Sequence, residues 1–249
     1  MDSHGSRHRT GTPALTSAER RLVARLRTPL AVQRYLNALP YNTEPPPGRA
    51  TLRSFRGVVR HRTAHCLEAA LFAATVLEQH GYPPLVISFE SIDELDHVIF
   101  VYQKRFRDPF SKSTPENGSR NRFSWGSVAR SRDPGLHGRK PVFATPRALA
   151  ASYLDEYVDL TGRITAFALV DLRVMGAYDW RLSGKNVWKV ERMLLDTRHQ
   201  PLGMPDARFR EFRRRYREFK ERHPNRKPLF YEGRHAWTPI PKQFLACPP

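Results

Sequence analysis

The chain of 249 residues contains only two cysteines, Cys66 and Cys247. Two cysteines cannot build a disulfide framework, and no CxxC motif or paired Cys/His spacing indicates a structural zinc site. The ten histidines show no spacing that repeats a metal-ligand pattern, so we expect no metal and no cofactor. Disulfide-rich scaffolds and zinc modules are therefore excluded as fold classes.

Long apolar segments are also absent from the sequence. No stretch approaches the roughly 18 apolar residues that a membrane-spanning helix needs. The first residues, MDSHGSRHRTGTP, have no apolar region of the kind that a secretory signal contains. We therefore expect no membrane partner, and the cytoplasm is the default location.

Acidic residues are few beside the basic ones: 24 Asp and Glu face 42 Lys and Arg, a formal net charge of +18. A surplus of this size attracts nucleic acid, anionic membranes or acidic substrates through long-range fields. No RNP pattern, recognition-helix module or repeat accompanies the charge. A basic nucleic-acid-associated protein is thus an alternative that rests on charge alone, and an Arg-rich solvated surface explains the same charge.

The remaining composition is that of a folded protein, with 40% hydrophobic and 27% charged residues, and its 21 prolines against 14 glycines indicate many fixed turns. Residues 1–13 are predicted to be a disordered tail. Residues 14–175 are predicted to form one domain, and residues 176–249 a helical and Pro-rich extension packed on the same domain. The sequence leaves the oligomeric state open.

Helix signals recur along the chain. Thr16 begins a T-x-x-E capping box that ends at Glu19, and Thr28 followed by Pro29 is a typical start of a second helix. The stretch 66–80 is apolar almost all round, which is typical of a buried core helix. Further helices are predicted from Pro146 through Tyr157 towards Gly162, over 186–196 and over 206–222.

Strand signals lie between the helices. Segments rich in β-branched and aromatic residues predict buried strands, and they are 84–89, 97–102 and 164–170. Residues 122–129 alternate in polarity and predict the second strand of a hairpin, whose long inserted loop is the polar stretch 104–121. The order of elements favours one α+β domain with extra helices at both ends.

Cys66 stands at the start of the predicted core helix. With Thr63 as the N-cap, the thiol lies in the first turn, where unpaired backbone N–H groups and the helix dipole favour a thiolate. His97 opens a strand 31 residues later, and a connection of that length can bring its imidazole beside a helix N-terminus as a base. The alternative is a buried cysteine and a structural histidine, both of which are common.

The residues around Cys66 and His97 resemble those of a known protein family. The segment 65–102, with its Cys-led Ala-rich helix, HGYPP turn and DHVIFVY strand, resembles the core of the transglutaminase-like superfamily. Upstream, YNTEPPPGRATLRSFRGVVRHRTAHC is similar to the lead-in of bacterial transglutaminase-like proteins. The resemblance covers residues 15–172. It implies a papain-like fold, in which a buried Cys-bearing helix packs on an antiparallel sheet, with Cys66 as nucleophile and His97 as base.

The resemblance also implies an acid that orients the histidine, four residues after a Trp on the following strand. Counting four residues from Trp125 gives Ala129, which cannot orient an imidazole, so the triad is incomplete at that position. Ser131 and Asp133 are the neighbouring candidates for this role. Asn42 is the candidate oxyanion-hole donor, together with the backbone N–H of the nucleophile.

The activity implied by this resemblance is thiol-dependent chemistry on a peptide or protein amide. Water as acceptor would make the protein a peptidase or amidase, and an amine would make it a transglutaminase-type acyl transferase. A catalytically inactive peptide- or partner-binding module of the same fold is the main alternative. The sequence does not separate these readings.

Overall fold

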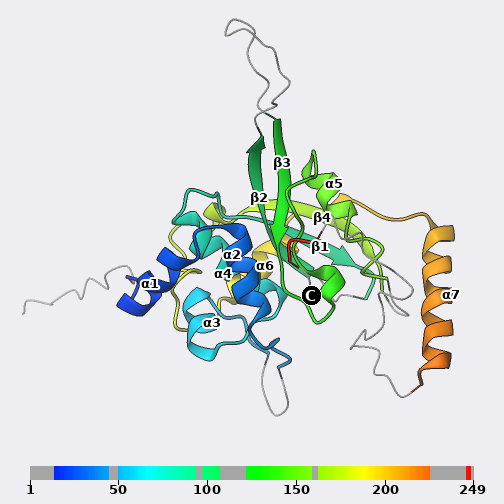
Figure 1. Ribbon diagram of the computed structural model, residues 1–249, viewed down its shortest axis with the longest axis horizontal. Helices are drawn as coiled ribbons and strands as arrows, with labels where there is room; N and C mark the ends of the chain where they lie inside the picture. The colour runs from blue at the N-terminus through cyan, green and yellow to red at the C-terminus, as the bar shows by residue number, and fades with distance from the viewer. Residues whose placement is uncertain are drawn as a thin grey trace, which may run out of the picture.

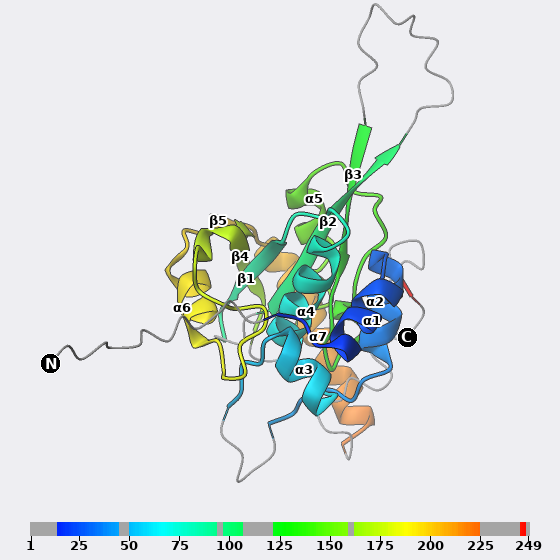
Figure 2. The same cartoon turned by 90° about the vertical axis from the view of Figure 1, so that its left-hand side faces the viewer.

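The computed structural model describes residues 14–44, 50–93, 97–106, 122–158, 162–224 and 245–247. Within these ranges helices pack around an antiparallel sheet, so the predicted α+β class is confirmed (Figures 1 and 2). The predicted tail 1–13 and most of the predicted loop 104–121 lie outside the described residues. No helix in the described part of the chain is long and apolar enough to cross a membrane.

The sheet has five strands in the order β3-β2-β1-β4-β5, and each pair of neighbours is antiparallel. The strands are β1 (Leu85–Ser91), β2 (His97–Phe106), β3 (Arg122–Val128), β4 (Ile164–Asp171) and β5 (Gln200–Pro201). β2 runs on into the predicted loop because residues 103–106 pair with residues 122–125 of β3. Backbone pairing, rather than the end of the apolar run, sets the length of this strand.

The helices are α1 (Ser17–Arg25), α2 (Pro29–Asn37), α3 (Phe55–His61), α4 (Cys66–Glu78), α5 (Pro146–Ala151), α6 (Trp188–Asp196) and α7 (Asp206–Arg222). Two 3₁₀ turns, η1 (Pro134–Leu136) and η2 (Leu172–Met175), complete the list for the described residues. The predicted N-caps Thr16 and Thr28 are confirmed, since each side chain accepts a backbone N–H of the first turn.

One helix prediction needs correction, and one helix was not predicted. α5 ends at Ala151 instead of continuing to Tyr157, because the backbone bonds change there from the i→i−4 to the i→i−3 pattern. The hydroxyl of Ser152 donates to the Leu149 carbonyl (2.7 Å) at this point. The short helix α3 was not predicted, since its residues FRGVVRH have no clear apolar period.

The core lies on both faces of the sheet. Val98 and Phe100 of β2 belong to the same apolar cluster as α4, whose residues 67–77 are all buried. Ile99 and Val101 point to the opposite face, where they pack with residues of α5. Figure 2 shows α4 alongside β2, and the two elements are in direct contact. The prediction of a buried core helix on an antiparallel sheet is thus confirmed.

The region beyond α5 adds to this core. Val187 and Val190 are buried in the cluster that contains α4, and the Val187 N–H donates to the Leu52 carbonyl (2.8 Å). α7 lies at one side of the molecule (Figure 1), where Phe212 packs with Val158 and Met204.

A fully buried arginine holds the segment between β3 and α5. Arg139 donates to the carbonyls of Gly135 (2.6 Å), His137 (2.9 Å) and Ser152 (3.2 Å). Its guanidinium also lies 4.1 Å from the ring centroid of Tyr153. The charge is therefore compensated by main-chain dipoles and an aromatic face. These bonds fix the geometry of η1 and of the residues after it.

We predict that Arg139→Met destabilises the protein by about 3 kcal/mol or more, because it leaves several buried carbonyls without donors. Arg192→Met is the matched control, since Arg192 is exposed on α6 and its loss is expected to change stability by less than about 0.5 kcal/mol. Urea unfolding measures both values. Equal changes in the two variants would contradict the structural role of Arg139.

Candidate active site

Cys66 is the first residue of α4, and the residue as a whole is partly exposed. The sequence suggested Thr63 as the N-cap of this helix, but the N-cap is His65. The Glu68 carboxylate accepts a hydrogen bond from the His65 backbone N–H (3.1 Å), as in a capping box. Thr63 instead accepts a hydrogen bond from Arg53 (2.7 Å). The thiol nevertheless lies in the first turn, at the positive end of a buried helix.

His97 is the first residue of β2 and is almost fully buried. Its ring stacks on Phe89 of β1 and leans against Tyr153, each at 6.1 Å between centroids. His97 Nε2 lies 3.2 Å from the carbonyl oxygen of Leu136 in η1. A neutral ring that donates Nε2–H to this carbonyl has its lone pair on Nδ1, which is then the atom able to accept a thiol proton.

The structure brings Cys66 into hydrogen-bonding contact with two imidazoles. Burial raises the pKa of the Cys66 thiol, but hydrogen bonds and charge from the side chains of His65 and His97 outweigh it and hold this pKa well below its ordinary value. Cys66 and His97, paired from the sequence, therefore lie together. The arrangement favours a thiolate over a thiol at neutral pH.

His65 is the second imidazole, and its part in the site was missed from the sequence. Burial lowers the pKa of His65, but its contacts with Cys66, Glu68 and Thr51 raise it to about 9 overall. His65 Nε2 lies 2.9 Å from the Thr51 carbonyl and 3.7 Å from Glu68 Oε1. At pH 7 the ring is therefore a cation next to the thiol. The sequence feature that could have indicated this role is the position of His65 directly before Cys66.

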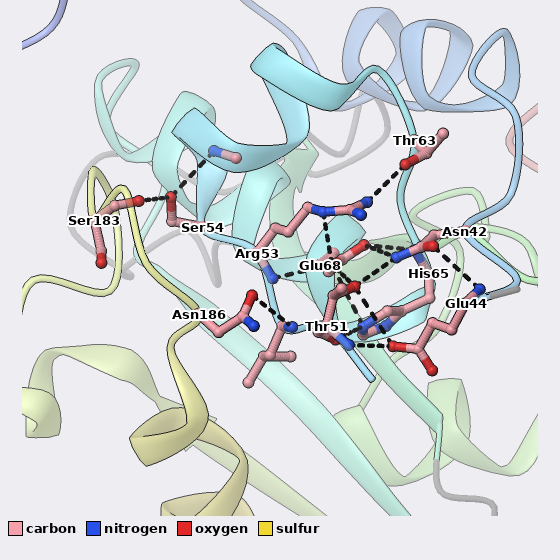
Figure 3. A network of polar contacts seen from close by, with 12 residues as sticks. Asn42, Glu44, Thr51, Arg53, Ser54, Thr63, His65, Glu68, Ser183 and Asn186 are labelled. Carbon is pink, nitrogen blue, oxygen red and sulfur yellow. Dashed lines mark hydrogen bonds and ion pairs between the residues drawn. The ribbon is translucent and has the colours of Figure 1, made fainter. Parts of the chain in front are cut away.

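A fully buried carboxylate organises this end of α4 (Figure 3). Glu68 Oε1 accepts from Thr51 Oγ1 (2.9 Å) and the Arg53 backbone N–H (3.0 Å), and Oε2 accepts from Asn42 Nδ2 (3.0 Å) and the His65 N–H (3.1 Å). Four donors thus satisfy both oxygens. The carboxylate ties the chain before α3 to the residue that precedes Cys66.

Asn42, the candidate oxyanion donor, lies in this Glu68 network. Its Nδ2 donates to Thr51 Oγ1 (2.7 Å) and to Glu68 Oε2 (3.0 Å), which uses both amide hydrogens. Its Oδ1 accepts the Glu44 N–H (3.3 Å). The side chain therefore holds the start of α4 in place.

Tyr41 is the side chain found at the Cys66 backbone N–H, which hydrogen-bonds to the Tyr41 hydroxyl. Burial and the charge of Cys66 raise the pKa of Tyr41 above its ordinary value, so the hydroxyl keeps its proton. Tyr41 is placed by a parallel bridge to Ala64, two residues before the cysteine. The backbone N–H and the hydroxyl together form a polar position beside the sulfur.

The residues proposed for the acid role belong to the turn that carries Leu136. Asp133 Oδ1 accepts the Gly135 N–H (2.8 Å) and caps η1, and the Asp133 N–H donates to Ser131 Oγ (3.2 Å). Ala129 is fully buried, and its N–H and carbonyl pair with the side-chain amide of Gln33 (2.9 and 2.8 Å). The group seen at His97 Nε2 is a main-chain carbonyl, which no residue type signals in a sequence.

The described residues contain no cluster of three or more His, Cys, Asp or Glu side chains able to hold a metal ion. A scan against models of known protein families finds no match to this chain, and a search of curated proteins finds no matching sequence. The geometry around Cys66 is therefore the basis for assigning a function.

We predict that Cys66 reacts with iodoacetamide at a nearly constant rate from pH 6.5 to 8.5, because its lowered pKa keeps it a thiolate throughout that range. Cys247 is buried, which raises its pKa, so its rate is expected to climb only towards alkaline pH. Mass spectrometry of Cys247→Ser and Cys66→Ser separates the two thiols. A Cys66 rate that rises tenfold per pH unit through this range would contradict the thiolate.

We predict that Glu68→Gln lowers stability by about 2–4 kcal/mol, because an amide cannot accept the four hydrogen bonds that both carboxylate oxygens receive. The pKa of His65 is expected to fall, since the Glu68 charge is one of the causes that raise it. Glu221→Gln on the exposed side of α7 is the control. Urea unfolding and histidine NMR titration measure the two effects, and a variant as stable as the control would contradict this account.

Proposed function

We propose that this protein is a thiol-dependent amide hydrolase or acyl transferase, in which Cys66 is the nucleophile and His97 moves the proton. The observation that carries the proposal is the Cys66 thiol on the first residue of a buried helix, hydrogen-bonded to the side chains of His97 and His65. A lowered thiol pKa at a partly accessible position is the condition for nucleophilic catalysis by cysteine.

The first half of the reaction forms a thioester. The Cys66 thiolate attacks the amide carbonyl carbon, and the carbonyl oxygen takes up the negative charge. The Tyr41 hydroxyl, whose oxygen accepts the Cys66 N–H, donates its own hydrogen to this oxyanion. As the C–N bond breaks, the protonated His97 gives its Nδ1 proton to the leaving amine. The products are the free amine and an acyl group on the sulfur.

The second half releases the acyl group. Water or a second amine attacks the thioester carbonyl, and neutral His97 accepts the proton of the attacking group at Nδ1. The C–S bond breaks and Cys66 leaves as a thiolate. This step restores the ion pair between the Cys66 thiolate and the protonated His97. Water gives a carboxylic acid and an amine gives a new amide, so the acceptor decides between hydrolysis and transfer.

The two imidazoles have different parts in this scheme. His65 is held by the Thr51 carbonyl and faces the Glu68 carboxylate, so it supplies charge to the thiolate and keeps its proton. His97 has a neutral carbonyl, that of Leu136, as its partner at Nε2. Since a neutral carbonyl stabilises an imidazolium less than a carboxylate does, we expect slower turnover than a complete triad would give.

The proposal extends to the fold and to the substrate class. A cysteine at the start of a core helix and a histidine at the start of an adjacent antiparallel strand support a papain-like, transglutaminase-like arrangement. The proposed substrates of this thiol-dependent reaction are peptide or protein amides.

The decisive experiment is detection of the thioester. The Cys247→Ser protein is mixed with a set of glutaminyl peptides and peptide amides, and hydroxylamine is then added as acceptor. We expect a mass increase on Cys66 equal to the acyl group, followed by release of a hydroxamate, and neither with Cys66→Ala. His97→Asn is expected to lower the rate by about a hundredfold or more.

A protein whose Cys66 alkylates fast but never becomes acylated would overturn the enzyme proposal. That result favours the peptide- or partner-binding module. The structural explanation for the missing activity would be that His97 is held by the neutral Leu136 carbonyl and not by a carboxylate. Acylation of Cys66 without release to water or hydroxylamine would argue for a covalent binder over a turnover enzyme.

A further inference from the structure

Two arginines lie over the ring of Tyr41, the tyrosine whose hydroxyl contacts the Cys66 backbone N–H. The Cζ atoms of Arg130 and Arg132 are 5.9 and 5.4 Å from the ring centroid of Tyr41. Both come from the chain between β3 and η1, immediately before the turn that carries the Leu136 carbonyl. The two guanidinium groups are therefore linked to the site through the Tyr41 side chain.

Neither guanidinium has a carboxylate within ion-pair distance in the described part of the chain. Other arginines there do have such partners, and examples are Arg56 with Glu19, Arg163 with Asp206 and Arg181 with Glu78. Among the described residues, the positive charges of Arg130 and Arg132 are therefore not neutralised by an acidic side chain.

Arg130 is half-buried and held in position. It donates to the carbonyls of Leu39 (3.1 Å) and Ser131 (3.0 Å), while its Nε is buried without a hydrogen-bond partner among the described residues. Arg132 is exposed and makes no hydrogen bond to another described residue. One arginine is therefore a fixed cation, and the other has its donors available for a ligand.

We propose that Arg130 and Arg132 form a carboxylate-binding subsite beside Cys66, which selects substrates with an acidic group next to the amide that is cleaved. This inference rests on the proposed function, because it names the substrate class of the same thiol. A guanidinium binds a carboxylate through two parallel N–H donors, which gives direction as well as charge. The charge of Arg130 would be compensated by the same ligand.

The probes are iodoacetate and iodoacetamide, which have the same size and leaving group and differ in a carboxylate against a neutral amide. Their alkylation rates at Cys66 are compared in the Cys247→Ser protein at pH 7. We expect the ratio of the iodoacetate rate to the iodoacetamide rate to fall about threefold to tenfold in Arg132→Ala and further in Arg132→Glu. Arg132→Lys is expected to retain part of the ratio.

Arg192→Ala is the matched control, because it removes the same charge from an exposed position on α6. His65 and His97 also attract an anionic reagent, but both are present in every variant, so the change in ratio isolates Arg132. An unchanged ratio in both Arg132→Ala and Arg132→Glu overturns the subsite and leaves the thiol chemistry intact. A parent protein that reacts slowly with both reagents overturns the proposed function instead.

Peptide substrates identify the source of the carboxylate. Amidated peptides with Glu or Gln beside the reacting amide are compared with a peptide that has a free C-terminal carboxylate at that place. We expect Arg132→Ala to raise KM for one of the two acidic peptides by about threefold to tenfold with kcat unchanged, and the affected peptide shows which carboxylate is bound. Equal KM values for Glu and Gln peptides and for the free terminus overturn the subsite.

Discussion

The site depends on one buried carboxylate, that of Glu68 at the start of α4. Four donors from Asn42, Thr51, Arg53 and His65 converge on it, so the chain before α3 and the beginning of the core helix are held as one unit. A buried carboxylate is stable only when its oxygens are satisfied, which makes the arrangement sensitive to the loss of any one partner. Cys66 directly follows His65 in the chain, so this cluster also fixes the position of Cys66.

The position of the acid is the unusual feature of the electrostatics. A carboxylate in a cysteine–histidine triad orients the base, whereas Glu68 lies against the other imidazole, that of His65. His97 is oriented by the Leu136 carbonyl, and the turn that carries this carbonyl is fixed by the buried guanidinium of Arg139. The rings of His65 and His97, which both lower the pKa of the Cys66 thiol, are thus held by separate parts of the structure.

The surroundings of the sulfur are positive on several sides. The start of α4 and the rings of His65 and His97 all favour an anion there, and two guanidinium groups lie over the neighbouring ring of Tyr41. A thiolate partly satisfies this environment, and an acidic substrate would satisfy it further. The overall charge of +18 acts in the same direction at longer range.

Residue type and spacing along the sequence predicted the caps at Thr16 and Thr28, the buried helix that begins at Cys66 and the main strands. These features depend on side-chain type and on the period of apolar residues, both of which can be observed directly in the sequence. The pairing of Cys66 with His97 was predicted from their spacing together with the resemblance around them. The Leu136 carbonyl at His97, the Tyr41 hydroxyl at the Cys66 N–H and the engagement of Asn42 by Glu68 were decided only in the tertiary structure. Every residue has a carbonyl, and no local pattern records which distant segment will lie against it, so such contacts follow from packing alone.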